Sequence, residues 1–67
     1  MARQHLGARI KAGRERAGLT QQELADRVGI TRVYVAKLEG ADRDSPSLPV
    51  LERIAKAIGV KLVDLLK

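Results

Sequence analysis

The stretch LTQQELADRVGITRVYVAKLEG, residues 19–40, carries the start signals of two short helices in close succession. In the first signal, Thr20 is followed three residues later by Glu23. This is the capping-box spacing, in which each side chain binds a free backbone N–H of the first helical turn. Leu19, just before the cap, and Leu24 can form the hydrophobic staple that fixes how the chain enters the helix.

These signals predict a helix from about Gln21 to Val28, ended by Gly29 in the left-handed conformation. The same pattern then recurs, because Thr31 can cap a second helix and Ile30, just before it, can staple to Val35. With so short a connection, the two helices cannot form a long antiparallel hairpin. They are expected to meet at a steep angle through a tight turn.

The second of these helices should have one buried and one outward face. At about 100° per residue, Val35 and Leu38 share one side. The opposite side and its flanks carry Arg32, Val33, Tyr34, Ala36 and Lys37. The predicted outward face is therefore polar and basic, with one exposed valine.

The N-terminal segment also has helical spacing. Leu6, Ile10 and Ala17 fall at helical intervals in a segment that ends near Gly18. Gly13 lies inside it, where glycine costs roughly 1 kcal/mol relative to alanine. Either this is a tolerated weak point, or another helix passes close to Gly13.

The C-terminal third predicts two more helices after the loop GADRDSPS, residues 40–47. A stripe of apolar residues runs from a predicted cap at Ser47 to Gly59 and consists of Leu48, Leu51, Ile54, Ala55 and Ile58. The tail VKLVDLLK, residues 60–67, offers Leu62, Leu65 and Leu66 as a last short helix. No alternating strand pattern persists, so the sequence predicts an all-α domain.

Composition narrows the functional classes. The 67 residues contain no cysteine and a single histidine, His5, so neither a disulfide framework nor a structural metal site is expected. The chain has no acid–base pair on a plausible cleft, no phosphate-binding glycine loop and too few residues to enclose a substrate, so we do not expect an enzyme.

The longest apolar runs predict neither a membrane span nor an export signal, and a cytoplasmic protein is expected. A net charge of +5 and a pI near 10.3 make nucleic acid a reasonable partner.

From Gln21 to Gly40 the chain resembles the helix-turn-helix of the phage repressor and Cro-like (XRE, Cro/C1-type) DNA-binding domains. Alanine stands at the fifth place of the motif, Ala25, and glycine at the ninth, Gly29. The flanking stretches RIKAGRERAGLTQQELA and PSLPVLERIAKAIGVKLVDLL resemble the first helix and the last two helices of such domains. The resemblance implies one compact, five-helix, lambda-repressor-like DNA-binding domain over residues 1–67, without a cofactor.

The resemblance also implies a role for individual residues. The second helix of the motif lies in the major groove in such domains, which makes Arg32, Val33 and Lys37 the candidates for base contacts. Gln21 becomes a phosphate contact at the positive end of its helix. Further candidates for phosphate contacts are Thr31, Tyr34, Arg43 and Arg9.

Some of these roles compete with structural alternatives. Tyr34 could hydrogen-bond a phosphate or pack over the fourth helix, and Val33 could touch a thymine methyl group or simply lie in solvent. Asp42 and Asp44 flank Arg43, and carboxylates near phosphates are repulsive. The loop could therefore tilt away from DNA and leave Arg43 as its only contact.

A structural pair is implied as well. Family domains often pair an arginine late in the first helix with a glutamate ending the third, here Arg14 and Glu39. The two side chains could form a buried ion pair or lie at the surface.

The sequence-based interpretation is thus a transcriptional regulator, expected to be a repressor, that binds double-stranded DNA sequence-specifically. The alternative is a protein-binding helical module, such as an antitoxin or a bridging factor, whose main partner is another protein. We expect a weak homodimer built around residues 62–66 on a pseudo-palindromic operator, although the terminal leucines could equally cap the core.

Overall fold

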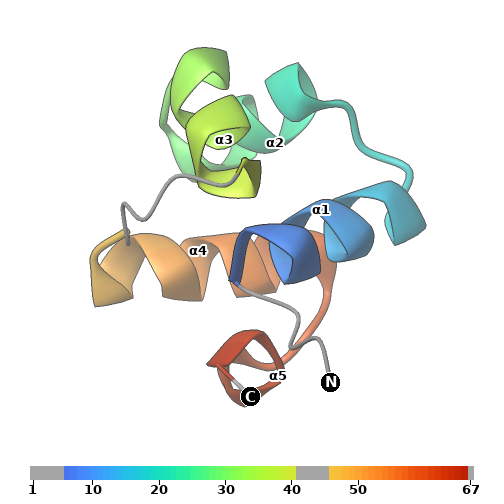
Figure 1. Cartoon of the computed structure of the whole chain (residues 1–67), viewed down its shortest axis with the longest axis vertical. Coiled ribbons are helices and arrows are strands. Elements are labelled where there is room, and N and C mark those ends of the chain that lie inside the picture. Colours follow the sequence, from blue (N-terminus) through green and yellow to red (C-terminus); the bar gives the residue numbers. More distant parts are fainter. Residues whose placement is uncertain (1–5, 41–45, 67) are drawn as a thin grey trace.

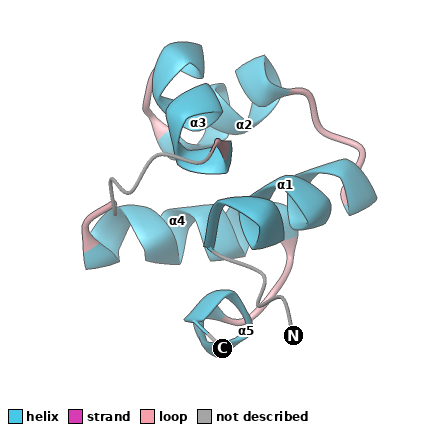
Figure 2. Ribbon diagram, in the orientation of Figure 1, coloured by secondary structure: helices cyan, strands magenta, loops and turns pink. Residues whose placement is uncertain are grey.

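The computed structural model describes residues 6–40 and 46–66, and in these ranges every regular element is a helix. In chain order they are α1 (Leu6–Arg16), α2 (Gln21–Val28), α3 (Arg32–Glu39), α4 (Leu48–Ile58) and α5 (Leu62–Leu66). Figure 2 shows the same helices coloured by element type. The all-α, five-helix prediction is confirmed.

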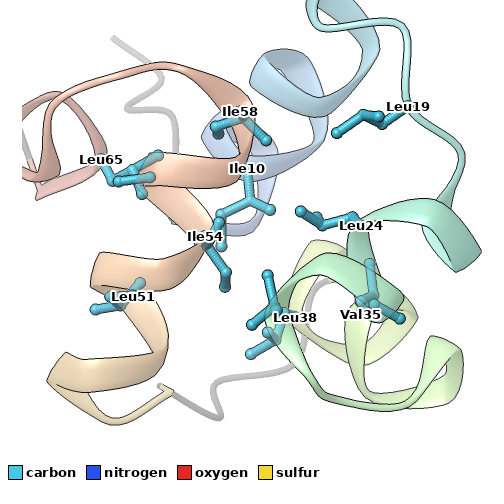
Figure 3. Close-up of a cluster of buried hydrophobic side chains, with 12 residues drawn as sticks. Ile10, Leu19, Leu24, Val35, Leu38, Leu51, Ile54, Ile58 and Leu65 are labelled. Carbon is cyan, nitrogen blue, oxygen red and sulfur yellow. The ribbon is translucent and has the colours of Figure 1, made fainter.

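The helices form three levels in Figure 1, with α2 and α3 at the top, α1 and α4 across the middle and α5 beneath them. Helix α3 packs on α1 and α2, whereas α5 packs on α1 and α4. Side chains from all five helices meet in one core, in which Ile10, Leu24, Val35 and Ile54 are the largest fully buried residues. Figure 3 shows these side chains converging between the helices.

The start of α2 forms as the sequence predicts. The hydroxyl Oγ1 of Thr20 accepts the backbone N–H of Glu23 at 3.0 Å, and the Thr20 N–H donates to Glu23 Oε1 at 2.8 Å. This backbone donation lowers the pKa of the Glu23 carboxyl below its ordinary value. Both staple residues, Leu19 and Leu24, are buried in the core.

The turn between α2 and α3 is also confirmed. Gly29 has φ of 84° and ends α2 in the left-handed conformation, which glycine adopts without steric cost. Thr31 caps α3 through the Tyr34 N–H, which donates to its Oγ1 at 3.1 Å. Ile30 packs partly buried against the core that contains Val35, as the second staple requires.

Two expectations about the apolar stripes were wrong. Ala17 lies just after α1 and is exposed, because the chain turns there and Leu19 enters the core instead. Leu48, the first residue of α4, is 55% exposed, whereas Pro46 just before the helix is buried. Ser47 does occupy the N-cap position of α4, although its side chain makes no capping hydrogen bond.

Glycine in α1 permits two close approaches. A Cβ on Gly13 would lie 2.6 Å from Cδ1 of Ile58, so the second explanation for this glycine holds and α4 passes beside it. A Cβ on Gly7 would overlap the backbone carbonyl of Leu38 and lie 3.0 Å from the carbonyl oxygen of Gly40. The start of α1 therefore lies directly against the end of α3.

None of the helices in the described residues has the length and apolar character needed to cross a membrane.

We expect Gly7→Ala to destabilise the domain more than Gly13→Ala does. At Gly7 the new methyl group would meet backbone atoms that cannot move without displacing α3, whereas at Gly13 it would meet the flexible end of Ile58. The cost at Gly7 should be about 1–3 kcal/mol, which is typical of overpacking. At Gly13 the gain in helix propensity, about 1 kcal/mol, should offset much of the strain. Thermal unfolding followed by circular dichroism measures both, and equal melting temperatures for the two variants would contradict this packing.

Candidate nucleic-acid interface

The outward surface of α3 is the candidate interface. Val35 and Leu38 anchor the helix in the core, and this leaves Arg32, Val33 and Lys37 exposed on its other side. Val33 is 56% exposed and presents apolar atoms to solvent on this side of the helix. The structure thus brings the three predicted base-contacting side chains together on one solvent-facing surface.

This surface is positively charged. Neither the Arg32 guanidinium nor the Lys37 ammonium forms an ion pair within residues 6–40 and 46–66. The acidic residue of the same helix, Glu39, is buried and already paired with Arg14. Among the described residues, nothing neutralises the two cations of α3.

Two residues at the edges of this surface have structural contacts of their own. Tyr34 is partly buried and packs against the core, and a phosphate contact by its hydroxyl stays a prediction. Thr31 is exposed, and its Oγ1 accepts the capping hydrogen bond from Tyr34. The Thr31 hydroxyl can still donate its own hydrogen to an acceptor outside the protein.

Gln21 lies at the first position of α2 and is half-buried. The sequence predicts a phosphate contact for it, but not the contact found within the protein. Its Nε2 donates to Oε1 of Glu39 at 3.1 Å, which joins the start of α2 to the end of α3. Sequence spacing could not reveal this bond, because the two residues are far apart in the chain and belong to different helices.

Glu39 and Arg14 form the expected ion pair, and it is buried. Arg14 Nε donates to Glu39 Oε2 at 2.6 Å and Arg14 Nη2 donates to Oε1 at 3.1 Å. The side chains are only 10% and 3% exposed, respectively. Hydrogen bonding to Glu39 raises the pKa of Arg14 above its ordinary value, which keeps the guanidinium charged.

A further bond of Arg14 extends this network to the entrance of α2. Arg14 Nη1 donates to the backbone carbonyl of Leu19 at 2.7 Å. Ala25, on α2, is fully buried in the core, where a small residue fits the space between packed helices. The described part of the chain leaves no buried side-chain nitrogen or oxygen without a hydrogen-bond partner.

Arg9 does not join the α3 surface. Its Nη1 donates to the backbone carbonyl of Asp64 in α5 at 3.4 Å, and it lines a cavity of about 320 Å³ with residues of α1, α4 and α5. Figure 1 places α5 on the side of α1 that faces away from α3. The phosphate contact of Arg9 stays a prediction, and it would lie apart from the α3 surface. Arg43 lies outside the described residues.

Comparisons with known proteins agree with this geometry. The HTH_3 helix-turn-helix family model matches residues 10–65. The immunity repressor protein of Bacillus phage phi105 is 44% identical over 57 residues, which are 85% of this chain and 39% of that repressor. The chain thus spans well under half the length of this relative.

Two solved structures are similar over almost the whole chain. The DNA-binding domain of the P22 c2 repressor has a TM-score of 0.92 at 30% identity. The match covers 100% of this chain and 87% of that domain. The regulator SinR in complex with DNA has a TM-score of 0.86 at 31% identity, with 92% of this chain and 98% of that chain covered. This likeness confirms the lambda-repressor-like fold.

We expect Arg14→Met to lower the free energy of unfolding by about 3–5 kcal/mol. Methionine fills much of the same space but leaves the Glu39 carboxylate buried without its cation, which is the costly way to break a buried ion pair. Arg16→Met, at an exposed position in the same helix, is the control and should change stability little. Urea unfolding measures both. If the two variants were equally stable, the Arg14–Glu39 pair would not hold the helices together.

Proposed function

The chain belongs to the HTH_3 helix-turn-helix family, and we propose on this basis that it is a sequence-specific regulator of transcription that reads double-stranded DNA with α3. The observation that carries the proposal is the exposed set of Arg32, Val33 and Lys37, whose two cations have no ion-pair partner among residues 6–40 and 46–66, on a helix whose other side is fixed in the core. The phage phi105 relative is an immunity repressor, and SinR has been solved in complex with DNA. The phage relative favours repression as the role of this chain, and the SinR complex favours DNA as its ligand.

The chemistry of the α3 surface suits the major groove. The Arg32 guanidinium or the Lys37 ammonium can donate to guanine O6 and N7, and Arg32 can do so with two hydrogen bonds. Val33 lies between the two cations in the sequence, and its apolar atoms are exposed to solvent. It can therefore contact the methyl group of thymine. The proposed readout thus combines polar recognition of guanine with apolar recognition of thymine.

Contacts to the DNA backbone would come from the starts of α2 and α3. The backbone N–H groups at the start of α2, next to Gln21, lie at the positive end of the helix dipole and attract a phosphate. The exposed Thr31 hydroxyl offers a similar contact at the start of α3. Such contacts set the register of the protein on DNA without selecting a sequence.

Protein binding is the alternative function. SinR has also been solved in a complex with the SinI protein, so a protein that contains a domain similar to this chain can bind another protein. Gel retardation on random DNA separates the two possibilities. Binding that weakens steeply as salt increases supports the DNA-binding function, and no retardation even at low salt supports the alternative.

We further propose that the regulator acts in the cytoplasm as a weak homodimer on a pseudo-palindromic operator. Val63 and Leu66 on α5 are 55% and 56% exposed, whereas Leu65 of the same helix is buried in the core. Two exposed apolar residues on one short helix favour a two-fold contact between copies. Dimeric helix-turn-helix proteins read half-sites about 34–36 Å apart on one face of the duplex.

We expect Arg32→Ala and Lys37→Ala each to relax base preference at one position of each half-site. The loss should be about 1–3 kcal/mol for a bidentate contact. Lys61→Ala, which removes an exposed lysine just before α5, is the control and should leave the preferred sequence unchanged. Selection of bound sequences from a random duplex pool, followed by titration on the selected site, gives both readouts. An unchanged selected sequence for Arg32→Ala would mean that α3 does not read the groove.

We expect two copies of the protein on each operator duplex at saturation and weaker self-association after Leu66→Ser. Leu48→Ser provides a matched control, because Leu48 is equally exposed but lies at the start of α4. Sedimentation with and without operator measures both effects. One copy per duplex at saturation, or a selected site without two-fold symmetry, would exclude this assembly.

A further inference from the structure

The Gln21 side chain connects two helix ends that the connecting turn does not bring together. Helix α3 is tied to α2 at its start through the short connection that contains Gly29 and Thr31. The hydrogen bond from Gln21 Nε2 to Glu39 Oε1, at 3.1 Å, ties the start of α2 to the opposite end of α3. Since α3 has eight residues, these two attachments are separated by about 12 Å along its axis.

The orientation of the Gln21 amide is dictated by chemistry. An ionised carboxylate only accepts hydrogen bonds, so the amide must present its NH₂ group to Glu39. Glu39 in turn is fixed by two bonds from Arg14, and its side chain is 3% exposed. The Gln21 amide is thus bound to a carboxylate that is buried and already held by two hydrogen bonds, so the amide has little rotational freedom. The second N–H and the carbonyl oxygen of Gln21 therefore stay in a defined place.

The neighbouring Gln22 shows what the same side chain does without such a partner. Its Nε2 donates to Asp26 Oδ1 at 2.9 Å, one turn further along the same helix, and both residues are exposed. This bond joins no two helices. Gln21 and Gln22 are thus adjacent residues of the same type, but only the side chain of Gln21 joins two helices.

We propose that Gln21 is a positioning residue, which sets the orientation of α3 relative to the start of α2 by holding Glu39. The inference rests on the proposed function, because it assigns these two helices to base reading and backbone binding. With α3 attached at both ends, its base-reading side chains keep a fixed offset from the phosphates bound at α2. Bidentate contacts tolerate little displacement, since hydrogen bonds weaken steeply away from their preferred distances and angles.

A positioning role and a simple phosphate contact predict different results. Loss of a phosphate contact weakens binding to all sequences alike, because the backbone is the same in each. Loss of the positioning bond displaces α3 and therefore weakens the operator complex more than the complex with random DNA. The ratio of the two dissociation constants separates these effects.

The test compares Gln21→Met with Gln22→Met in the full chain. Methionine has nearly the length of glutamine but no N–H donor, and the backbone N–H of residue 21 remains. Dissociation constants are measured on the selected operator and on a random duplex, at one salt concentration and at a temperature at which circular dichroism shows all variants folded. Gln21→Met should reduce the specificity ratio roughly tenfold, the loss expected from about one bidentate base contact, and Gln22→Met should leave it unchanged.

Residual dipolar couplings of the free protein provide a second measurement that does not depend on DNA. The orientation of α3 relative to α2 should change in Gln21→Met and stay as in the wild type in Gln22→Met. An equal loss of affinity on both duplexes, no loss on either, or an unchanged helix orientation would overturn the positioning role and leave the proposed function standing. A wild-type protein that selects no DNA sequence would instead refute the proposed function, and the helix orientation alone would then decide whether Gln21 positions α3.

Discussion

The arrangement of the first three helices depends on the hydrogen bonds that the buried carboxylate of Glu39 accepts. It accepts hydrogen bonds from Arg14 in α1 and Gln21 in α2 while belonging itself to α3. Burying a charge is costly unless its partners are in place, so the full set of bonds must form together. These bonds join the three helices at one side chain, and removing any donor leaves the buried carboxylate with fewer partners.

Close packing of the backbone supports the same arrangement. Gly7 lets the start of α1 lie against the last carbonyl groups of α3, and Arg14 near the end of α1 holds Glu39 and the carbonyl of Leu19. Helix α1 thus contacts the helix-turn-helix at both of its ends. The candidate interface owes its shape to this support, although neither residue lies on it.

Local signals made most of the fold predictable. The caps at Thr20 and Thr31 and the left-handed Gly29 each depend on residues a few positions apart, and the sequence states these directly. Contacts between distant residues were harder to foresee. Arg9 lies with α5 and Gln21 binds Glu39 because of where whole helices pack, which no local spacing encodes. The Arg14–Glu39 pair was foreseen only through a family resemblance, and its burial required the structure.

The two faces of α3 have separate tasks, and this separation has a consequence for how such a protein can change. Val35 and Leu38 hold the helix in the core, whereas Arg32, Val33 and Lys37 are exposed. Substitutions at the three exposed positions therefore leave the free energy of folding nearly untouched. If the proposed readout holds, a lineage or an engineer could exchange the three residues in combination and obtain new DNA preferences from one unaltered scaffold.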